Sequence, residues 1–223
     1  MQPRTHAFVI RAAVAAARCD WLRTHEAALL QGNEAEDDFV LGPLRLRAPG
    51  LTHSYRPGSR FGELWAPSAR TQLERWLQRA SRASSSSRAA FWLGRACHLL
   101  GDMAVPARTR GVWHLLGDPL EAFWEAHEDL AALLPLQLPA TRESCLQHAE
   151  SLARFSSSFA ADTTRTPWGA ARFRLLNDGQ RLDSQELSEQ AVQLLTRAVS
   201  HTRDFLREQA AQLGSPTETT ASL

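Results

Sequence analysis

The sequence lacks lysine: all 25 of its basic residues are arginine, and they nearly balance 24 acidic residues. No long run of one sign occurs, so the charge pattern does not predict a surface for nucleic acid or for an anionic membrane. The arginine bias is better explained by the base composition of the gene than by phosphate binding.

Cysteine and long apolar runs are also scarce. Cys19, Cys97 and Cys145 are odd in number and lack CxxC spacing, which argues against a disulfide framework or a zinc–cysteine site and favours buried thiols. The apolar stretch over residues 7–17 is interrupted by Arg11 and is too short for a spanning helix. The sequence as written therefore predicts neither a signal peptide nor a membrane anchor, and it leaves the cellular compartment open.

Strand signals are nearly absent, whereas apolar residues recur at helical spacing, as in Phe8, Ile10 and Val14. We expect an all-α fold, a multi-helix bundle forming one domain over about residues 1–213, with a frayed tail over about 214–223. The expected helices cover about 5–19, 21–31, 67–80, 85–103, 118–133, 140–161 and 184–212. A long segment punctuated by glycine and proline, Gly32 to Ala66, is expected to be irregular and functional.

Two His–Asp pairs carry the candidate chemistry. His98 and Asp102 lie four residues apart on a predicted helix, so both side chains can reach one cation; a hydrogen-bonded core pair is the alternative. His114 and Asp118 repeat the spacing, but Asp118 precedes Pro119 and is also typical of a helix N-cap.

The segment from His98 to Glu121 resembles the central motif of the zinc-dependent phospholipase C and S1/P1 nuclease family. Two upstream segments also resemble that family: Thr5-His6 at the start of the first helix, and an acidic loop at residues 32–37 followed by Thr52-His53-Ser54-Tyr55-Arg56-Pro57. The resemblance implies an all-helical zinc hydrolase in which a zinc-bound hydroxide attacks a phosphodiester.

The resemblance also implies the ligand sets. Asp37, His53, His98 and Asp102 would surround one zinc ion. His6, Asp102 and the amine and carbonyl of Met1 would hold a second, with Asp102 as the bridge, and Asp37 would also orient the attacking water. His114 and Asp118 would belong to a third site, in which Glu121 ranks lower because it lies seven residues from His114.

Two positions depart from the family pattern: Met1 stands where secreted members of the family have a tryptophan, and Arg108 differs at the third site. Arg108 stands where the third site has a histidine, and an arginine does not ligate zinc because it stays protonated. We therefore expect two zinc ions and a lost or weak third site. Arg108 either supplies a fixed cation beside a phosphate oxygen or points to solvent.

These patterns predict a monomeric, phospholipase C-like phosphodiester hydrolase without a transmembrane segment, acting on phospholipid head groups in preference to single-stranded nucleic acid. A single-strand-preferring nuclease and a zinc-binding homologue without turnover are the alternatives. The remaining histidines lie among polar helical residues and are expected to face solvent: His25, His127, His148 and His201.

Overall fold

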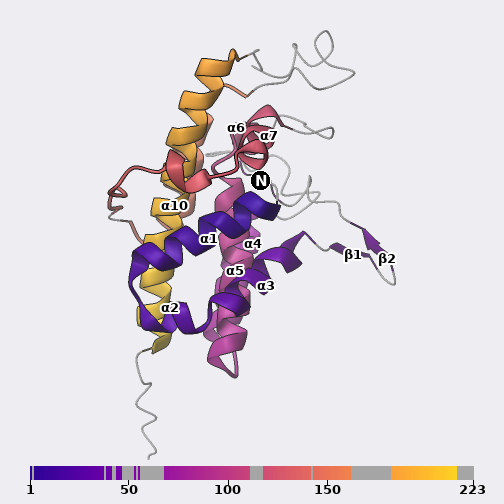
Figure 1. Cartoon of the computed structure of the whole chain (residues 1–223). Coiled ribbons are helices and arrows are strands. Elements are labelled where there is room, and N and C mark those ends of the chain that lie inside the picture. The colour runs from indigo at the N-terminus through magenta and orange to yellow at the C-terminus, as the bar shows by residue number, and fades with distance from the viewer. Residues whose placement is uncertain are drawn as a thin grey trace, which may run out of the picture.

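The computed structural model describes residues 1, 3–37, 39–41, 44–46, 53, 55, 68–110, 118–141, 143–161 and 182–214. These residues form helices and one short β-hairpin (Figure 1), which confirms the predicted all-α class. In chain order the elements are α1 (Pro3–Ala17), α2 (Asp20–Thr24), α3 (Glu26–Glu36), β1 (Phe39–Leu41), β2 (Leu44–Leu46), α4 (Ala69–Ser81), α5 (Ser86–Asp102), α6 (Pro106–Thr109), α7 (Pro119–Ala126), the 3-10 helix η1 (Leu130–Leu133), α8 (Cys145–Ser157) and α10 (Ser184–Gly214).

Helix α5 is the centre of the molecule. It packs against α3 and α4, while α1 crosses it and packs along α10 (Figure 1). Residues 97–102 of α5 are all buried, so this half of the helix is surrounded on every side rather than on one face. The polar side chains within it, His98 and Asp102, must therefore find partners inside the protein.

Helices α3 and α5 touch through their backbones at two glycines. A Cβ atom at Gly32 would lie 1.9 Å from the carbonyl oxygen of Phe91, and one at Gly94 would lie 2.0 Å from that of Leu29. The expectation that Gly32 begins an irregular segment was wrong, because this glycine permits helix packing and α3 continues to Glu36.

Other boundaries differ from those expected. The helix predicted over 21–31 is divided at His25 into α2 and α3, and part of the segment expected to be irregular forms the antiparallel pair β1–β2, with Val40 opposite Arg45. The helix predicted over 118–133 ends at Ala126, and the Asp129 carboxylate then accepts hydrogen bonds from the first turn of η1.

The long helix α10 matches its predicted range closely. Its 31 residues span about 46 Å, and the carboxylate of Asp183 accepts hydrogen bonds from the backbone N–H groups of Gln185 and Glu186 at its start. Within the described ranges, no helix combines the length and apolar character needed to cross a bilayer. The buried face of α10 instead includes polar residues such as His201 and Arg203.

Candidate metal centre

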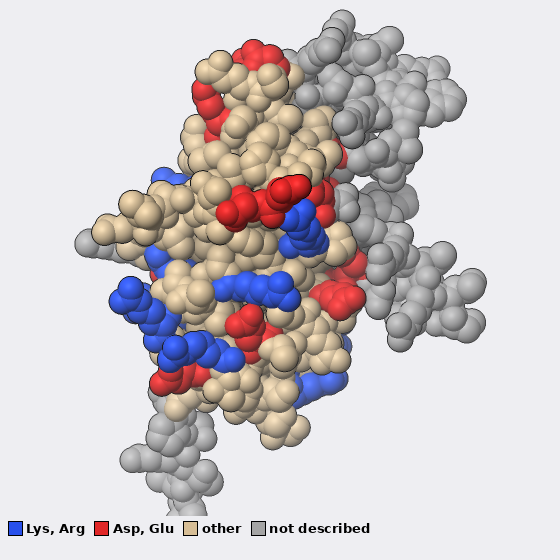
Figure 2. Space-filling model, viewed as in Figure 1, with Lys and Arg blue, Asp and Glu red and all other residues tan. Residues whose placement is uncertain are grey.

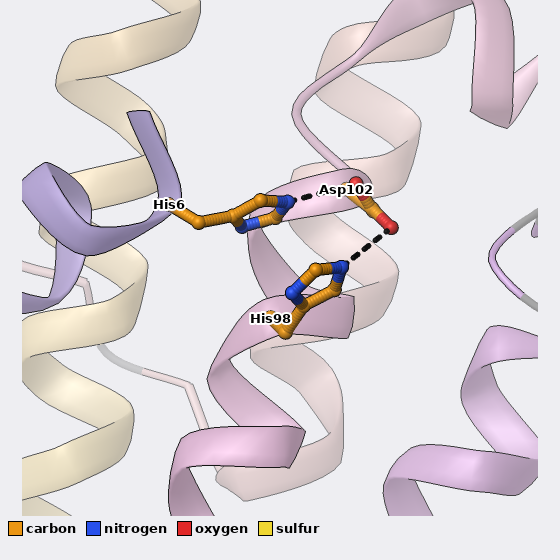
Figure 3. Close-up of side chains that lie close together, drawn as sticks. All are labelled: His6, His98 and Asp102. Carbon is orange, nitrogen blue, oxygen red and sulfur yellow. Dashed lines mark ion pairs between the residues drawn. The ribbon is translucent and has the colours of Figure 1, made fainter. Parts of the chain in front are cut away.

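Side chains from several elements converge on Asp102, the last residue of α5. The carboxylate is completely buried. Figure 3 shows His6, from the first turn of α1, and His98, one turn earlier on α5, both directed toward it. The predicted pair His98 and Asp102 thus shares one face of α5, and His6 approaches Asp102 from α1.

The two carboxylate oxygens of Asp102 face different groups. Oδ1 lies 2.6 Å from the amine of Met1, 3.2 Å from Nε2 of His6 and 3.1 Å from Nε of Arg108. Oδ2 lies 2.8 Å from Nδ1 of His53 and 3.6 Å from Nε2 of His98. This division follows the two ligand sets implied by the family resemblance, with Asp102 between them.

Asp37 joins the residues that face the Oδ2 atom of Asp102. Its Oδ1 atom lies 3.4 Å from Nε2 of His98, and potential ligand atoms of Asp37, His53 and His98 lie within 4.8 Å of one another. The potential ligand atoms of His6, His98 and Asp102 also lie within 4.8 Å of one another, so the two sets overlap at His98. The six residues predicted at the first two sites therefore meet in one place.

The orientation of His98 is fixed from behind by helix α3. Its Nδ1 atom lies 3.0 Å from the backbone carbonyl oxygen of Asn33. A carbonyl only accepts, so Nδ1 carries a hydrogen, and the ring turns Nε2 toward Asp37 and Asp102. The ring also stacks on that of His6, with centroids 3.8 Å apart.

Burial and neighbouring charges keep His6 neutral and keep Asp37 and Asp102 ionised at neutral pH, the forms in which these side chains bind a metal. Burial, together with the adjacent His98 and the N-terminal amine, lowers the pKa of His6 to about 3. Burial alone would raise the pKa of Asp37, but its contact with His98 outweighs this and lowers it to about 2. The pKa of Asp102 also falls well below its ordinary value, because Arg108 and the amine outweigh its desolvation.

Unsatisfied polar atoms test whether this residue set fits a metal. Four buried atoms aimed at the centre make no hydrogen bond: His6 Nε2, His53 Nδ1, His98 Nε2 and Asp102 Oδ2. Such atoms are costly unless paired, and imidazole nitrogens with carboxylate oxygens are preferred zinc ligands. The residues present therefore fit a zinc centre.

Arg108 and Glu121 close one side of the centre. Arg108 is buried, with Nη2 3.4 Å from Glu121 Oε1, and that oxygen lies 2.9 Å from the Met1 amine. Of the two alternatives for Arg108, the solvent-facing one is wrong, because two carboxylates draw the guanidinium inward. The sequence ranked Glu121 low as a metal ligand because it lies seven residues from His114. In the structure it lies one helical turn after Asp118, in α7, and its side chain reaches the centre.

The predicted third site is only partly visible. Asp118 is buried and caps α7, as its position before Pro119 indicated: its Oδ1 atom accepts hydrogen bonds from the N–H groups of Leu120 and Glu121. His114 lies outside the described residues. The pairing of His114 with Asp118 therefore stays a prediction.

Tyr55, two residues after His53, is held through both its backbone and its side chain. The Tyr55 backbone N–H donates to the carbonyl of Arg108 at 3.3 Å, and its hydroxyl donates to Glu150 of α8. Glu36 supports the other side of His53, with Oε1 4.0 Å from Nε2. Residues 32–37 belong to the acidic segment of the family resemblance, but the contacts of Glu36 and of the Asn33 carbonyl were not predicted, because both depend on how α3 packs against α5.

Two of the histidines expected to face solvent do not. His148 and His201 are 1% and 3% exposed. They are 53 residues apart in sequence, and the packing of α8 against α10 brings them into contact. His25 and His127 are half-buried.

Comparison with known proteins gives structural matches alone: no protein-family model and no curated protein matches this sequence. The alpha-toxin of Clostridium perfringens from avian strain SWCP superposes with a TM-score of 0.63 at 13% identity, over 98% of this chain and 66% of that one. The alpha-toxin of Clostridium absonum gives a TM-score of 0.61 at 12% identity, over 95% and 64%.

The chain thus spans about two thirds of the length of both toxins. The likeness extends over nearly the whole of the present chain. The all-helical fold implied by the sequence motifs is confirmed, because this protein shares its fold with the two clostridial alpha-toxins.

Proposed function

We propose that the protein is a zinc-dependent phosphodiester hydrolase of the phospholipase C-like type. The observation that carries the proposal is the buried Asp102 carboxylate, whose two oxygens face separate groups of nitrogen and oxygen ligands. A carboxylate in this position can bridge two cations. An ordinary core ion pair would not leave three histidine nitrogens around it without hydrogen bonds.

We assign the ligands to two sites according to which oxygen of Asp102 they face. His53, His98, Asp37 and Oδ2 of Asp102 would hold one ion. The second would be held by His6, Oδ1 of Asp102 and the Met1 amine in its neutral form. When bound, zinc supplies a Lewis acid for the phosphoryl oxygens and lowers the pKa of water to about 7.

Asp37 is the group we assign to orienting water. It is the most exposed carboxylate of the first two ligand sets, with its side chain 19% exposed, and its low pKa keeps it ionised at neutral pH. An ionised carboxylate accepts a hydrogen bond from a water molecule and so directs the oxygen lone pair toward phosphorus.

Arg108 is the second catalytic candidate. Its guanidinium is held by Asp102 and Glu121 at the edge of the centre, so its charge is fixed in position. A fixed cation stabilises charge that develops on a phosphate during attack, the part a third metal would otherwise play. We therefore propose two zinc ions rather than three.

Phospholipid head groups are the preferred substrate class. The sequence motifs resemble the zinc-dependent phospholipase C family, and the fold is shared with two clostridial alpha-toxins. Figure 2 shows basic and acidic side chains interspersed on the face in view rather than gathered into a basic groove. A groove of that kind would favour a single-strand nuclease. We propose that the protein acts as a monomer, since all the candidate ligands come from one chain.

Metal analysis and paired assays test this function. The zinc-loaded protein is expected to retain about two ions at this centre and to hydrolyse a phosphocholine ester faster than single-stranded DNA. Asp102→Asn should lose both ions and lower turnover by about 100-fold or more. Asp20→Asn is the matched control, because the side chain of Asp20 is 89% exposed and lies in α2.

The outcomes separate the alternatives. Faster cleavage of single-stranded DNA would favour a nuclease, and bound zinc with no turnover of either substrate would favour a homologue that has lost activity. Less than one zinc ion per loaded chain would refute the mechanism altogether. Circular dichroism of Asp102→Asn is needed to show that the variant is folded.

A further inference from the structure

A second cluster of metal-ligand side chains lies between α8 and α10 and shares no residue with the centre around Asp102. Glu143 precedes α8, His148 lies in its first turns and His201 lies in the middle of α10. The Glu143 Oε2 atom is 3.7 Å from Nδ1 of His148 and 3.3 Å from Nδ1 of His201. The two Nδ1 atoms are 3.3 Å apart.

One buried atom of this cluster lacks a hydrogen-bond partner. The nearby Thr141 hydroxyl donates to Asp204 at 2.8 Å, and its oxygen lies 3.3 Å from Nδ1 of His148. Oε2 of Glu143 is buried without a hydrogen-bond partner. Two imidazole nitrogens and a carboxylate oxygen thus face one point.

We propose that Glu143, His148 and His201 bind a divalent transition-metal ion, preferably zinc. Zinc lies about 2.0–2.1 Å from nitrogen and oxygen ligands in a tetrahedron, which places ligand atoms about 3.3–3.4 Å apart. Two of the three measured separations equal 3.3 Å and the third is 3.7 Å. The ion supplies the partner that the buried Oε2 atom of Glu143 lacks.

The surroundings hold the ligands in place. Asp204 accepts hydrogen bonds from both the N–H and the hydroxyl of Thr141, and Arg203 pairs with both carboxylate oxygens of Asp204. This network fixes the segment before α8 against α10, two residues from Glu143. The fourth coordination position faces an open pocket lined by Thr141, Glu143, His148, Asp204, Arg207 and Glu208. The site ties the start of α8 to α10, and water from the pocket completes the ligand set.

Zinc counts in single and double variants test the second site. Each protein is loaded with zinc, freed of excess ion and analysed for metal per chain. His201→Gln is expected to lose about one equivalent relative to the wild type, and Glu143→Gln to weaken zinc binding by about tenfold or more. His127→Gln is the matched control, because His127 belongs to neither cluster.

The variant His98→Gln distinguishes this site from the centre around Asp102. If both proposals hold, His98→Gln and His201→Gln lose different ions, and the double variant loses the sum. If the centre around Asp102 binds no zinc, His98→Gln leaves the count unchanged while His201→Gln still lowers it. A folded His201→Gln with the zinc count of the wild type overturns the second site. If that variant does not fold, unchanged affinity in Glu143→Gln does so.

Discussion

Replacing Gly94 by alanine tests whether the contact between α3 and α5 positions the metal centre. The new Cβ atom would lie 2.0 Å from the carbonyl oxygen of Leu29 and 3.0 Å from the backbone nitrogen of Asn33. Both neighbours are backbone atoms of α3, so no side chain can rotate away. The helices must separate by about 1.4 Å to restore an ordinary contact of 3.4 Å.

The separation has two costs. Overpacking a buried helix contact costs about 1–3 kcal/mol. The hydrogen bond from His98 Nδ1 to the Asn33 carbonyl, 3.0 Å long, would stretch beyond bonding range, for about 1 kcal/mol more. We expect Gly94→Ala to lower the free energy of unfolding by about 2–4 kcal/mol, a large part of the stability of an ordinary domain.

Urea unfolding of the metal-free protein measures this loss, and zinc titration measures its effect on the site. Gly214→Ala is the matched control, because nothing lies within 4 Å of its Cβ position at the end of α10; its stability should change by less than about 0.5 kcal/mol. A Gly94→Ala protein with the wild-type urea midpoint and zinc affinity would refute the close approach of the two helices.

Three further substitutions probe other features. Arg108→His should raise the zinc count by about one if Arg108 occupies a vacated third site, and an unchanged count would contradict that placement. Trp124→Phe should lower the free energy of unfolding by about 1–3 kcal/mol, because the buried indole N–H donates to the Ala191 carbonyl at 3.1 Å; a wild-type urea midpoint would argue against this bond. Asp204→Asn should reduce the loss of stability in acid. Burial raises the pKa of Asp204, but Arg203 and Thr141 lower it to about 2 from 3.8, so its ionised form stabilises the fold above about pH 4 and that stability is lost as the pH falls toward 2. Because the side chain is partly exposed, the difference between pH 6 and pH 3, measured by urea unfolding in EDTA, should be at most about 1 kcal/mol.

Local spacing predicted the features that arise within one helix. His98 and Asp102 share a face of α5, and Asp118 caps α7 where its position before proline indicated. Both outcomes depend on residues only a few positions apart, for which helix geometry is sufficient.

The meeting of His6, Asp37 and His53 with the pair His98 and Asp102 was implied only by the family resemblance, and several other features that depend on tertiary packing were not predicted. Gly32 looks like a helix breaker in sequence, but the nearby backbone of Phe91 explains why it lies inside α3. His148 and His201 looked like surface residues because their helical neighbours are polar, and their burial follows from the pairing of α8 with α10. Glu121 reaches the centre through its contacts with the Met1 amine and Arg108, and sequence spacing does not predict contacts between these residues.

The contacts of Asp102 relate metal binding to folding. The Met1 amine and Asp102 are 101 residues apart in sequence, so the unfolded chain seldom brings them together. Among the proposed ligands, only His98 and Asp102 are close enough in sequence to bind an ion together in the unfolded chain. An ion at the proposed centre would consequently bind the native state far more tightly than the unfolded one, and its removal by a chelator would make the chain easier for proteases to cut.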